Sequence, residues 1–139
     1  MILSTDKVFL QLLSDKILVR DHFKQSYLDH AYVEQRFGVK PEKFVDFLAL
    51  TGDNTNSIRG VPGIGPKTAA KLIDDFGSLD EILAATESAK SDDPAAVLSM
   101  KMRDKFVDYS EDARQAQSLV RLQTDLVLGL NLKALRYKL

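Results

Sequence analysis

A run of three glycines and two prolines, Gly60-Val61-Pro62-Gly63-Ile64-Gly65-Pro66, constrains this chain more than any other stretch. Glycine permits positive φ and close approach of a second backbone, whereas proline fixes φ and suits the first position of a helix. The run therefore predicts a tight, open hairpin that leads into a helix. Apolar residues recur at helical spacing from Ala69 to Phe76, and Gly77 is a natural stop. We expect this helix to begin with unpaired amides, which can hold an anion such as a phosphate group.

Two other phosphate-binding motifs fit the run poorly. A Walker loop needs a glycine directly before Lys-Ser/Thr, but Pro66 separates Gly65 from Lys67. The G-x-G-x-x-G fingerprint fails because Thr68 stands where its third glycine belongs. The remaining alternative is a turn between two helices that binds nothing, since glycine and proline are common in ordinary turns.

Composition limits the size and the location of the protein. With 139 residues, 45% of them hydrophobic, the chain can bury one modest core. The absence of cysteine excludes disulfides, thiolate metal sites and a cysteine nucleophile. There is no apolar run of membrane-spanning length and no signal-peptide pattern, so we expect a soluble cytoplasmic protein without a membrane partner. The net charge of -1 means that any nucleic-acid binding is local, through backbone amides with Arg59, Lys67 and Lys71 near the hairpin.

The first 28 residues are predicted to form a small β/α unit. Residues 2–5 are typical of the end of a buried strand, and a helix follows over residues 6–13. Residues 16–20 and 22–27 are predicted as two further strands. Because a lone buried strand needs neighbours, we interpret residues 1–28 as the C-terminal edge of an α/β core and the chain as the C-terminal part of a longer protein.

The chain from residue 29 to residue 139 is predicted to be helical. Asp29 caps a short helix that Gly38 ends, and Pro41 begins an apolar helix that stops at residues 51–52. A polar connector, residues 53–57, leads from that helix to the hairpin. The predicted fold class is therefore mainly α: a helix-hairpin-helix domain with a small N-terminal β/α remnant.

Beyond Gly77 the pattern stays helical, with interruptions. A capping box at residues 78–81 begins a short helix, and residues 86–94 are predicted as a surface loop. A long helix is expected from about residue 95 to residue 120, with a break near Ser110. The tail, residues 124–139, is predicted to combine an extended piece with a short last helix that docks on the body.

Three further motifs carry a resemblance. They are Leu3-Ser4-Thr5-Asp6-Lys7, Phe47-Leu48-Ala49-Leu50-Thr51-Gly52-Asp53 and Arg121-Leu122-Gln123-Thr124-Asp125. Together with the hairpin they resemble the 5′ nuclease family, which includes the flap endonucleases and the 5′-3′ exonuclease domain of bacterial DNA polymerase I. The last motif, with Asn131-Leu132, is most similar to the small bacterial flap endonucleases of the exonuclease IX (Xni) type. The resemblance covers nearly the whole chain and implies a helix-three-turn region that binds duplex or 5′-flap DNA beside a nuclease core.

The chain departs from this family at two acidic pairs. Where the family has Asp-x-Asp after the strand, Asp6 is present but Val8 replaces the second carboxylate. Where it has Asp-x-x-Asp after the glycine, Asp53 is present and Asn56 replaces its partner. No catalytic residue is therefore assigned, and Asp6 and Asp53 are the candidates for a residual metal cluster. Their alternatives are an N-cap for Asp6 and a turn former for Asp53.

The resemblance also implies two sets of binding residues at the hairpin. A potassium ion would be held by backbone carbonyls, here those of Leu50, Thr51, Arg59, Val61 and Ile64. DNA would touch the chain through amides, a lysine and a threonine hydroxyl, over Gly63, Ile64, Gly65, Pro66, Lys67 and Thr68. Contacts of this kind position the protein on the DNA backbone and do not read the bases. Binding is therefore predicted to depend on DNA structure and on salt concentration.

These patterns predict one function and leave two alternatives open. The first is structure-specific DNA binding by the C-terminal part of a 5′-3′ exonuclease or 5′-flap endonuclease of DNA replication and repair. The full-length family enzyme is a Mg²⁺-dependent hydrolase, and whether this chain cleaves DNA alone is left undecided, as is its oligomeric state. The alternatives are a non-catalytic helix-hairpin-helix DNA-binding accessory protein and a helical interaction module with a vestigial hairpin.

Overall fold

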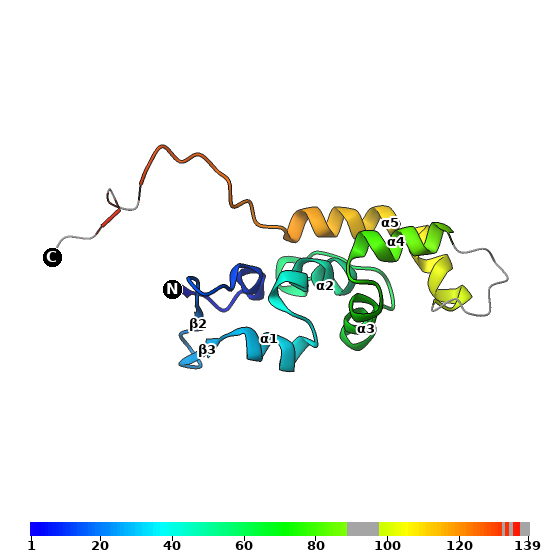
Figure 1. The fold of residues 1–139 in the computed structure, drawn as a ribbon, viewed down its shortest axis with the longest axis horizontal. Coiled ribbons are helices and arrows are strands. Elements are labelled where there is room, and N and C mark those ends of the chain that lie inside the picture. The colour runs from blue at the N-terminus through cyan, green and yellow to red at the C-terminus, as the bar shows by residue number, and fades with distance from the viewer. Residues whose placement is uncertain (89–97, 132, 134, 137–139) are drawn as a thin grey trace.

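The computed structural model, which describes residues 1–88, 98–131, 133, 135 and 136, is mainly helical with one small sheet (Figure 1). This confirms the predicted fold class. With η marking 3₁₀ helices, the elements in chain order are β1 (Ile2–Leu3), η1 (Lys7–Leu12), β2 (Val19–Asp21), β3 (Ser26–Leu28), α1 (His30–Phe37), η2 (Pro41–Lys43), α2 (Phe44–Thr51), η3 (Asn54–Asn56), α3 (Pro66–Phe76), α4 (Leu79–Ser88) and α5 (Met100–Val120).

The sheet has the order β1-β2-β3, with β1 parallel to β2 and β3 antiparallel to β2. Its strands are shorter than predicted, and residues 22–25 form a turn where a strand was expected. The cause is Asp21, whose carboxylate accepts hydrogen bonds from the amides of Phe23 and Lys24 and so bends the chain. The prediction of a buried first strand was also wrong, because Leu3 is 58% exposed.

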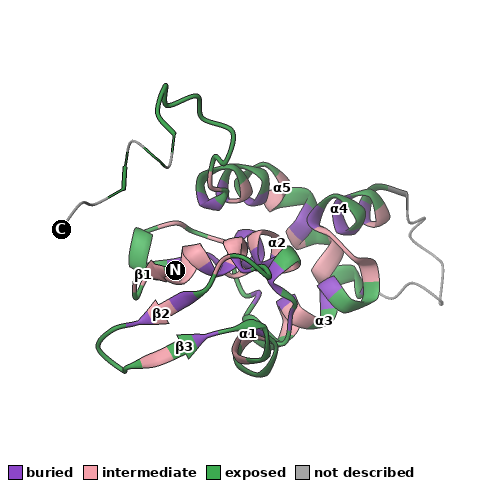
Figure 2. Ribbon diagram, turned by 60° about the vertical axis from the view of Figure 1, so that its left-hand side comes forward, coloured by how far each residue is buried: buried purple, intermediate pink, exposed green. Residues whose placement is uncertain are grey.

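Helix α2 lies at the centre of the core and packs against α3, α4 and α5 (Figure 2). The predicted helix from Pro41 is present as η2 followed by α2, and most of the apolar residues of α2 are buried. The rings of Phe44 and Phe47 stack at 5.7 Å, and the edge of Phe37 from α1 meets both. None of the described helices is both long and apolar enough to cross a membrane.

Several predicted boundaries match the structure. The Asp29 carboxylate accepts a hydrogen bond from the Tyr32 amide at the start of α1, and Gly38 ends that helix at φ 74°. Helix α3 starts at Pro66 and ends before Gly77, as its glycine and proline positions indicated. The predicted break in the long helix is present as well, because Tyr109 has non-helical φ and ψ next to Ser110.

Two boundaries around the predicted loop at residues 86–94 differ. Helix α4 continues to Ser88, since the Thr86 hydroxyl donates within the helix to the Ile82 carbonyl and the side chain is buried. Helix α5 begins at Met100, with Ser99 in an extended conformation as its N-cap. Residues 89–97, which include the rest of the predicted loop and the predicted start of the long helix, lie outside the described residues.

Gln11 joins the N-terminal unit to the end of α5. Its side-chain amide donates to the Val120 carbonyl at 2.9 Å, and its oxygen accepts from the Leu122 amide at 3.1 Å. Beyond these two hydrogen bonds, the tail from residue 124 leads away from the helices (Figure 1). The predicted docking of the tail is wrong for its described part: Val127 is 97% exposed, and none of its apolar side chains belongs to the described core. Leu132, expected in a last helix, lies outside the described residues.

Candidate nucleic-acid interface

The hairpin is fixed to the end of α2 by a close backbone approach. The Val61 amide donates to the Leu50 carbonyl at 2.9 Å, which brings the hairpin against the last turn of α2. A Cβ atom at Gly60 would collide with the Leu50 carbonyl oxygen and the Gly52 amide nitrogen. Glycine at position 60 is therefore required by packing, because any side chain would push the hairpin away from α2.

The tip of the hairpin alternates buried anchors with exposed glycines. Val61 and Ile64 are buried in the core, and the Ile64 amide donates to the Val61 carbonyl at 3.1 Å. Gly63, between them, has a φ of 75°, which favours glycine. Since Gly63 and Gly65 are exposed and have no side chains, a ligand can approach the backbone of the tip closely.

The start of α3 offers free amides. Gly65 is the N-cap and has no side chain to bond the first turn, and Pro66 has no N–H. Among the described residues, no group accepts a hydrogen bond from the amide of Lys67 or Thr68. A Cβ atom at Gly65 would meet nothing within 4 Å, so the approach to these amides is open. Of the six predicted DNA contacts only Ile64 has a buried side chain, and it can face a ligand through its backbone alone.

Four of the five residues predicted to hold potassium line one cavity. It has a volume of ≈ 640 Å³, and Thr51, Arg59, Val61 and Ile64 line it.

 The carbonyls of Leu50 and Val61 each accept one amide and keep a second lone pair. No described group donates to the carbonyls of Thr51, Arg59 and Ile64. Backbone carbonyls of this kind are suitable ligands for K⁺, so the residues present fit such an ion.

Sequence reasoning missed one basic residue at the hairpin. A side chain at Gly63 would collide with the ammonium of Lys105, which comes from α5. Lys105 is far from the hairpin in sequence and belongs to no motif there, so no local pattern could have indicated this contact.

Four side chains from two segments form an acidic cluster next to the connector. The Lys7 ammonium lies 3.1 Å from Asp53 Oδ1, and the Asn56 side-chain amide donates to Asp53 Oδ2 at 2.8 Å. The same amide lies 3.3 Å from Asp6 Oδ2. Asn56 therefore connects the two aspartates that were candidates for a residual metal cluster.

Each aspartate of the cluster also has the local role that was its alternative. Asp6 is the N-cap of η1, where its Oδ1 accepts from the Val8 amide at 2.9 Å. Asp53 is the N-cap of η3 and accepts from the Thr55 amide at 3.1 Å. Burial alone would raise the pKa of Asp53, but the hydrogen bond from Asn56 and the Lys7 ammonium lower it below its ordinary value of 3.8.

This cluster does not fit a divalent metal ion. Such an ion needs several hard oxygen ligands that converge on it. Here there are two carboxylates, both of which already accept hydrogen bonds, and the positive charge next to Asp53 is supplied by Lys7. In the part of the chain that the structure describes, no group of three or more acidic, histidine or cysteine side chains could hold a metal.

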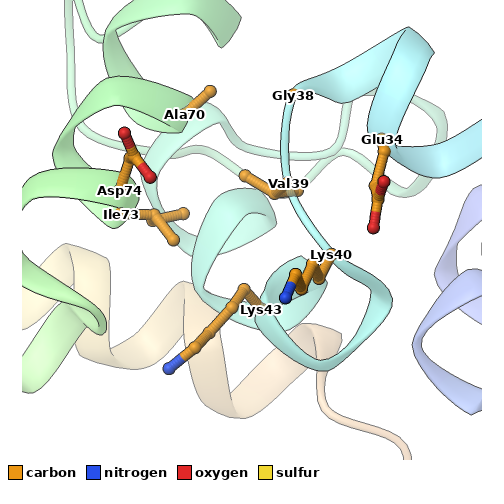
Figure 3. A pocket seen from close by; sticks show the side chains of 8 residues that line it. All are labelled: Glu34, Gly38, Val39, Lys40, Lys43, Ala70, Ile73 and Asp74. Atoms are coloured by element: carbon orange, nitrogen blue, oxygen red, sulfur yellow. The ribbon is translucent and has the colours of Figure 1, made fainter.

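A second cavity, of ≈ 390 Å³, lies between the end of α1, η2 and α3. Its lining carries two lysines, Lys40 and Lys43, and two acidic residues, Glu34 and Asp74 (Figure 3). The four formal charges cancel, and none of the predicted hairpin contacts lines this cavity. It therefore gives no reason to move the candidate site away from the hairpin.

Comparison with known proteins identifies a family. The model described as 5′-3′ exonuclease, C-terminal SAM fold, matches residues 39–139. The flap endonuclease Xni of Aeromonas salmonicida is 48% identical over 98% of this chain and 48% of its own length. The flap endonuclease Xni of Tolumonas auensis is 44% identical over the same shares of the two chains. This chain thus spans about half the length of the curated relatives it matches.

Solved structures share the fold. The structure of the T5 5′-exonuclease with bound zinc aligns with a TM-score of 0.70 and 24% identity, over 85% of this chain and 41% of that chain. A bacteriophage T5 flap endonuclease, solved in a complex with DNA and metal ions, aligns with the same TM-score, identity and coverage. At this identity the comparison shows a common fold.

Proposed function

Because the chain belongs to the 5′-3′ exonuclease family, we propose that its hairpin binds the backbone of duplex DNA at a 5′ flap. The observation that carries this proposal is the open start of α3, where the amides of Lys67 and Thr68 are unpaired beside two exposed glycines. Phosphate oxygens accept hydrogen bonds from such amides, and the positive end of the helix dipole favours their charge. The named relatives are flap endonucleases, which supports DNA as the ligand.

We further propose that K⁺ takes part in this contact. Thr51, Arg59 and Ile64 line the cavity of the hairpin, and no described group donates a hydrogen bond to their carbonyls. The carbonyls of Leu50 and Val61 would complete the ligand set. A bound cation would add positive charge at the hairpin of a chain whose net charge is -1.

Cleavage is proposed for the full-length protein, as a 5′-3′ exonuclease or 5′-flap endonuclease in DNA replication and repair. Bound Mg²⁺ would activate water and stabilise the charge that develops on the phosphate. The Asp6 and Asp53 cluster does not fit that ion, and the relatives are about twice the length of this chain. The role proposed for the residues described here is to hold the duplex.

A binding assay tests the proposal. Fluorescence anisotropy with a labelled 5′-flap duplex, without Mg²⁺, gives the affinity of the chain and of a variant that combines Gly65→Val with Lys67→Ala. We expect the variant to bind much more weakly, because it covers the amides and removes a charge. Lys16→Ala is the matched control, since Lys16 is an exposed lysine of the N-terminal unit. Equal affinity of the chain and the double variant would show that the hairpin is not the site.

Two further measurements separate the remaining possibilities. Titrations in KCl and NaCl of equal ionic strength test the cation, and tighter binding in KCl is expected. Incubation of the flap duplex with Mg²⁺ tests cleavage, and we expect a complex without a cleaved product. Cleavage that Asp6→Ala or Asp53→Ala abolishes would instead show that the acidic cluster is catalytic. Absence of any DNA binding would favour the helical interaction module.

A further inference from the structure

Lys105 occupies a distinctive position against the tip of the hairpin. Its ammonium occupies the space that a Cβ atom at position 63 would need. The lysine can lie there because residue 63 is a glycine. Helix α5 is held in this orientation by its neighbour Phe106, which is fully buried. The packing of α5 on the core therefore brings a positive charge to a part of the hairpin that is distant in sequence.

The ammonium of Lys105 has no counter-charge within the described chain. The ion pairs found there involve Lys7, Lys24 and Arg114, and no hydrogen bond from Lys105 is present among the described residues. The acidic neighbours on α5, Asp104 and Asp108, are exposed and are not paired with it. A half-buried ammonium without a carboxylate partner is free to meet an anionic ligand.

We propose that Lys105 is a phosphate-contact residue of the DNA-binding hairpin. It lies against Gly63, at the beginning of the segment whose amides at Lys67 and Thr68 are open to a ligand. A duplex that sets one phosphate on the start of α3 can set another against Lys105. This inference rests on the proposed function. It extends the DNA-binding site from the hairpin to a second segment, helix α5.

The salt dependence of DNA binding tests this contact. Affinity for the labelled 5′-flap duplex is measured at several KCl concentrations for the chain, Lys105→Gln, Lys105→Arg and the control Lys16→Gln. Each lost phosphate contact lowers the slope of log K against log salt by about one, and at about 0.1 M salt it weakens binding on the order of tenfold. We expect this change for Lys105→Gln, and we expect Lys105→Arg and Lys16→Gln to behave like the unaltered chain.

A second readout needs no variant. Acetylation of lysines by acetic anhydride, followed by mass spectrometry, compares the chain with and without DNA, and we expect DNA to protect Lys105 and not Lys16. If the unaltered chain binds DNA but Lys105→Gln keeps its slope and Lys105 stays reactive, the contact is refuted while the hairpin proposal stands. If the unaltered chain binds no duplex, both proposals fail.

Discussion

At the scale of single residues, the ion pair between Lys7 and Asp53 gives the acidic cluster a positive charge of its own. Asp53 is 0% exposed, and the hydrogen bond from Asn56 together with the Lys7 ammonium lowers the pKa of its carboxyl despite this burial. The sequence alone showed which carboxylates were present. It could not show that a lysine next to Asp6 reaches the other aspartate.

Removal of Lys7 tests how far this pair stabilises the fold. Lys7→Met leaves the buried Asp53 carboxylate without its counter-charge. Breaking a buried ion pair lowers the free energy of unfolding by about 3–5 kcal/mol. Because Lys7 is partly exposed, we expect a loss near the lower end of this range. Arg114→Met is the control, because its pair with Asp80 is exposed and is worth at most about 1 kcal/mol. Urea unfolding measures both. Equal losses in the two variants would contradict the special role of the buried pair.

The stability of the chain is expected to fall in acid partly through Asp53. Its folded pKa is below the ordinary value of 3.8, so the folded state binds fewer protons than the unfolded state between these two values. The contribution is complete above about pH 4 and is lost as the pH falls through the folded pKa. Urea midpoints between pH 7 and the acid range should therefore decline less steeply for Asp53→Asn. The pKa of Asp21 is also lowered, by a hydrogen bond from the Lys24 amide. Asp21 is present in both the unaltered chain and Asp53→Asn, so it does not contribute to the difference between them.

At the scale of elements, the hairpin shows why two glycines in one motif have different tasks. Gly60 is pressed against α2, whereas Gly65 faces open space. We expect Gly60→Ala to lower the free energy of unfolding by about 1–3 kcal/mol through overpacking. Gly65→Ala, at a φ of -88° that alanine tolerates, should leave it nearly unchanged. Thermal unfolding of the two variants distinguishes these effects, and a larger loss at Gly65 would refute this assignment.

The elements that could be predicted are those with local markers. Asp29, Gly38, Pro66 and Gly77 set the ends of α1 and α3 through their own backbone or capping chemistry. Contacts between distant segments could not be predicted in this way. The Asn56 bridge between two aspartates and the position of Lys105 at Gly63 depend on how whole helices pack.

At the scale of the molecule, we expect the exposed tail to contribute much less than the buried core to the free energy of unfolding. Leu126, Val127 and Leu128 are exposed, so replacing all three by serine should change the free energy of unfolding by less than about 0.5 kcal/mol. Leu10→Ala, at a buried position, should cost about 2–5 kcal/mol. Urea unfolding checks both values. Exposed apolar patches promote association, so sedimentation velocity should show less self-association for the serine variant.

The Lys7 ammonium has a consequence for the way this molecule depends on its surroundings. A dissolved ion stabilises a fold according to its concentration, by mass action. The charge that balances Asp53 is instead part of the polypeptide, and its amount per molecule cannot vary. The charge that balances Asp53 is therefore present in every molecule, whatever the composition of the surrounding solution.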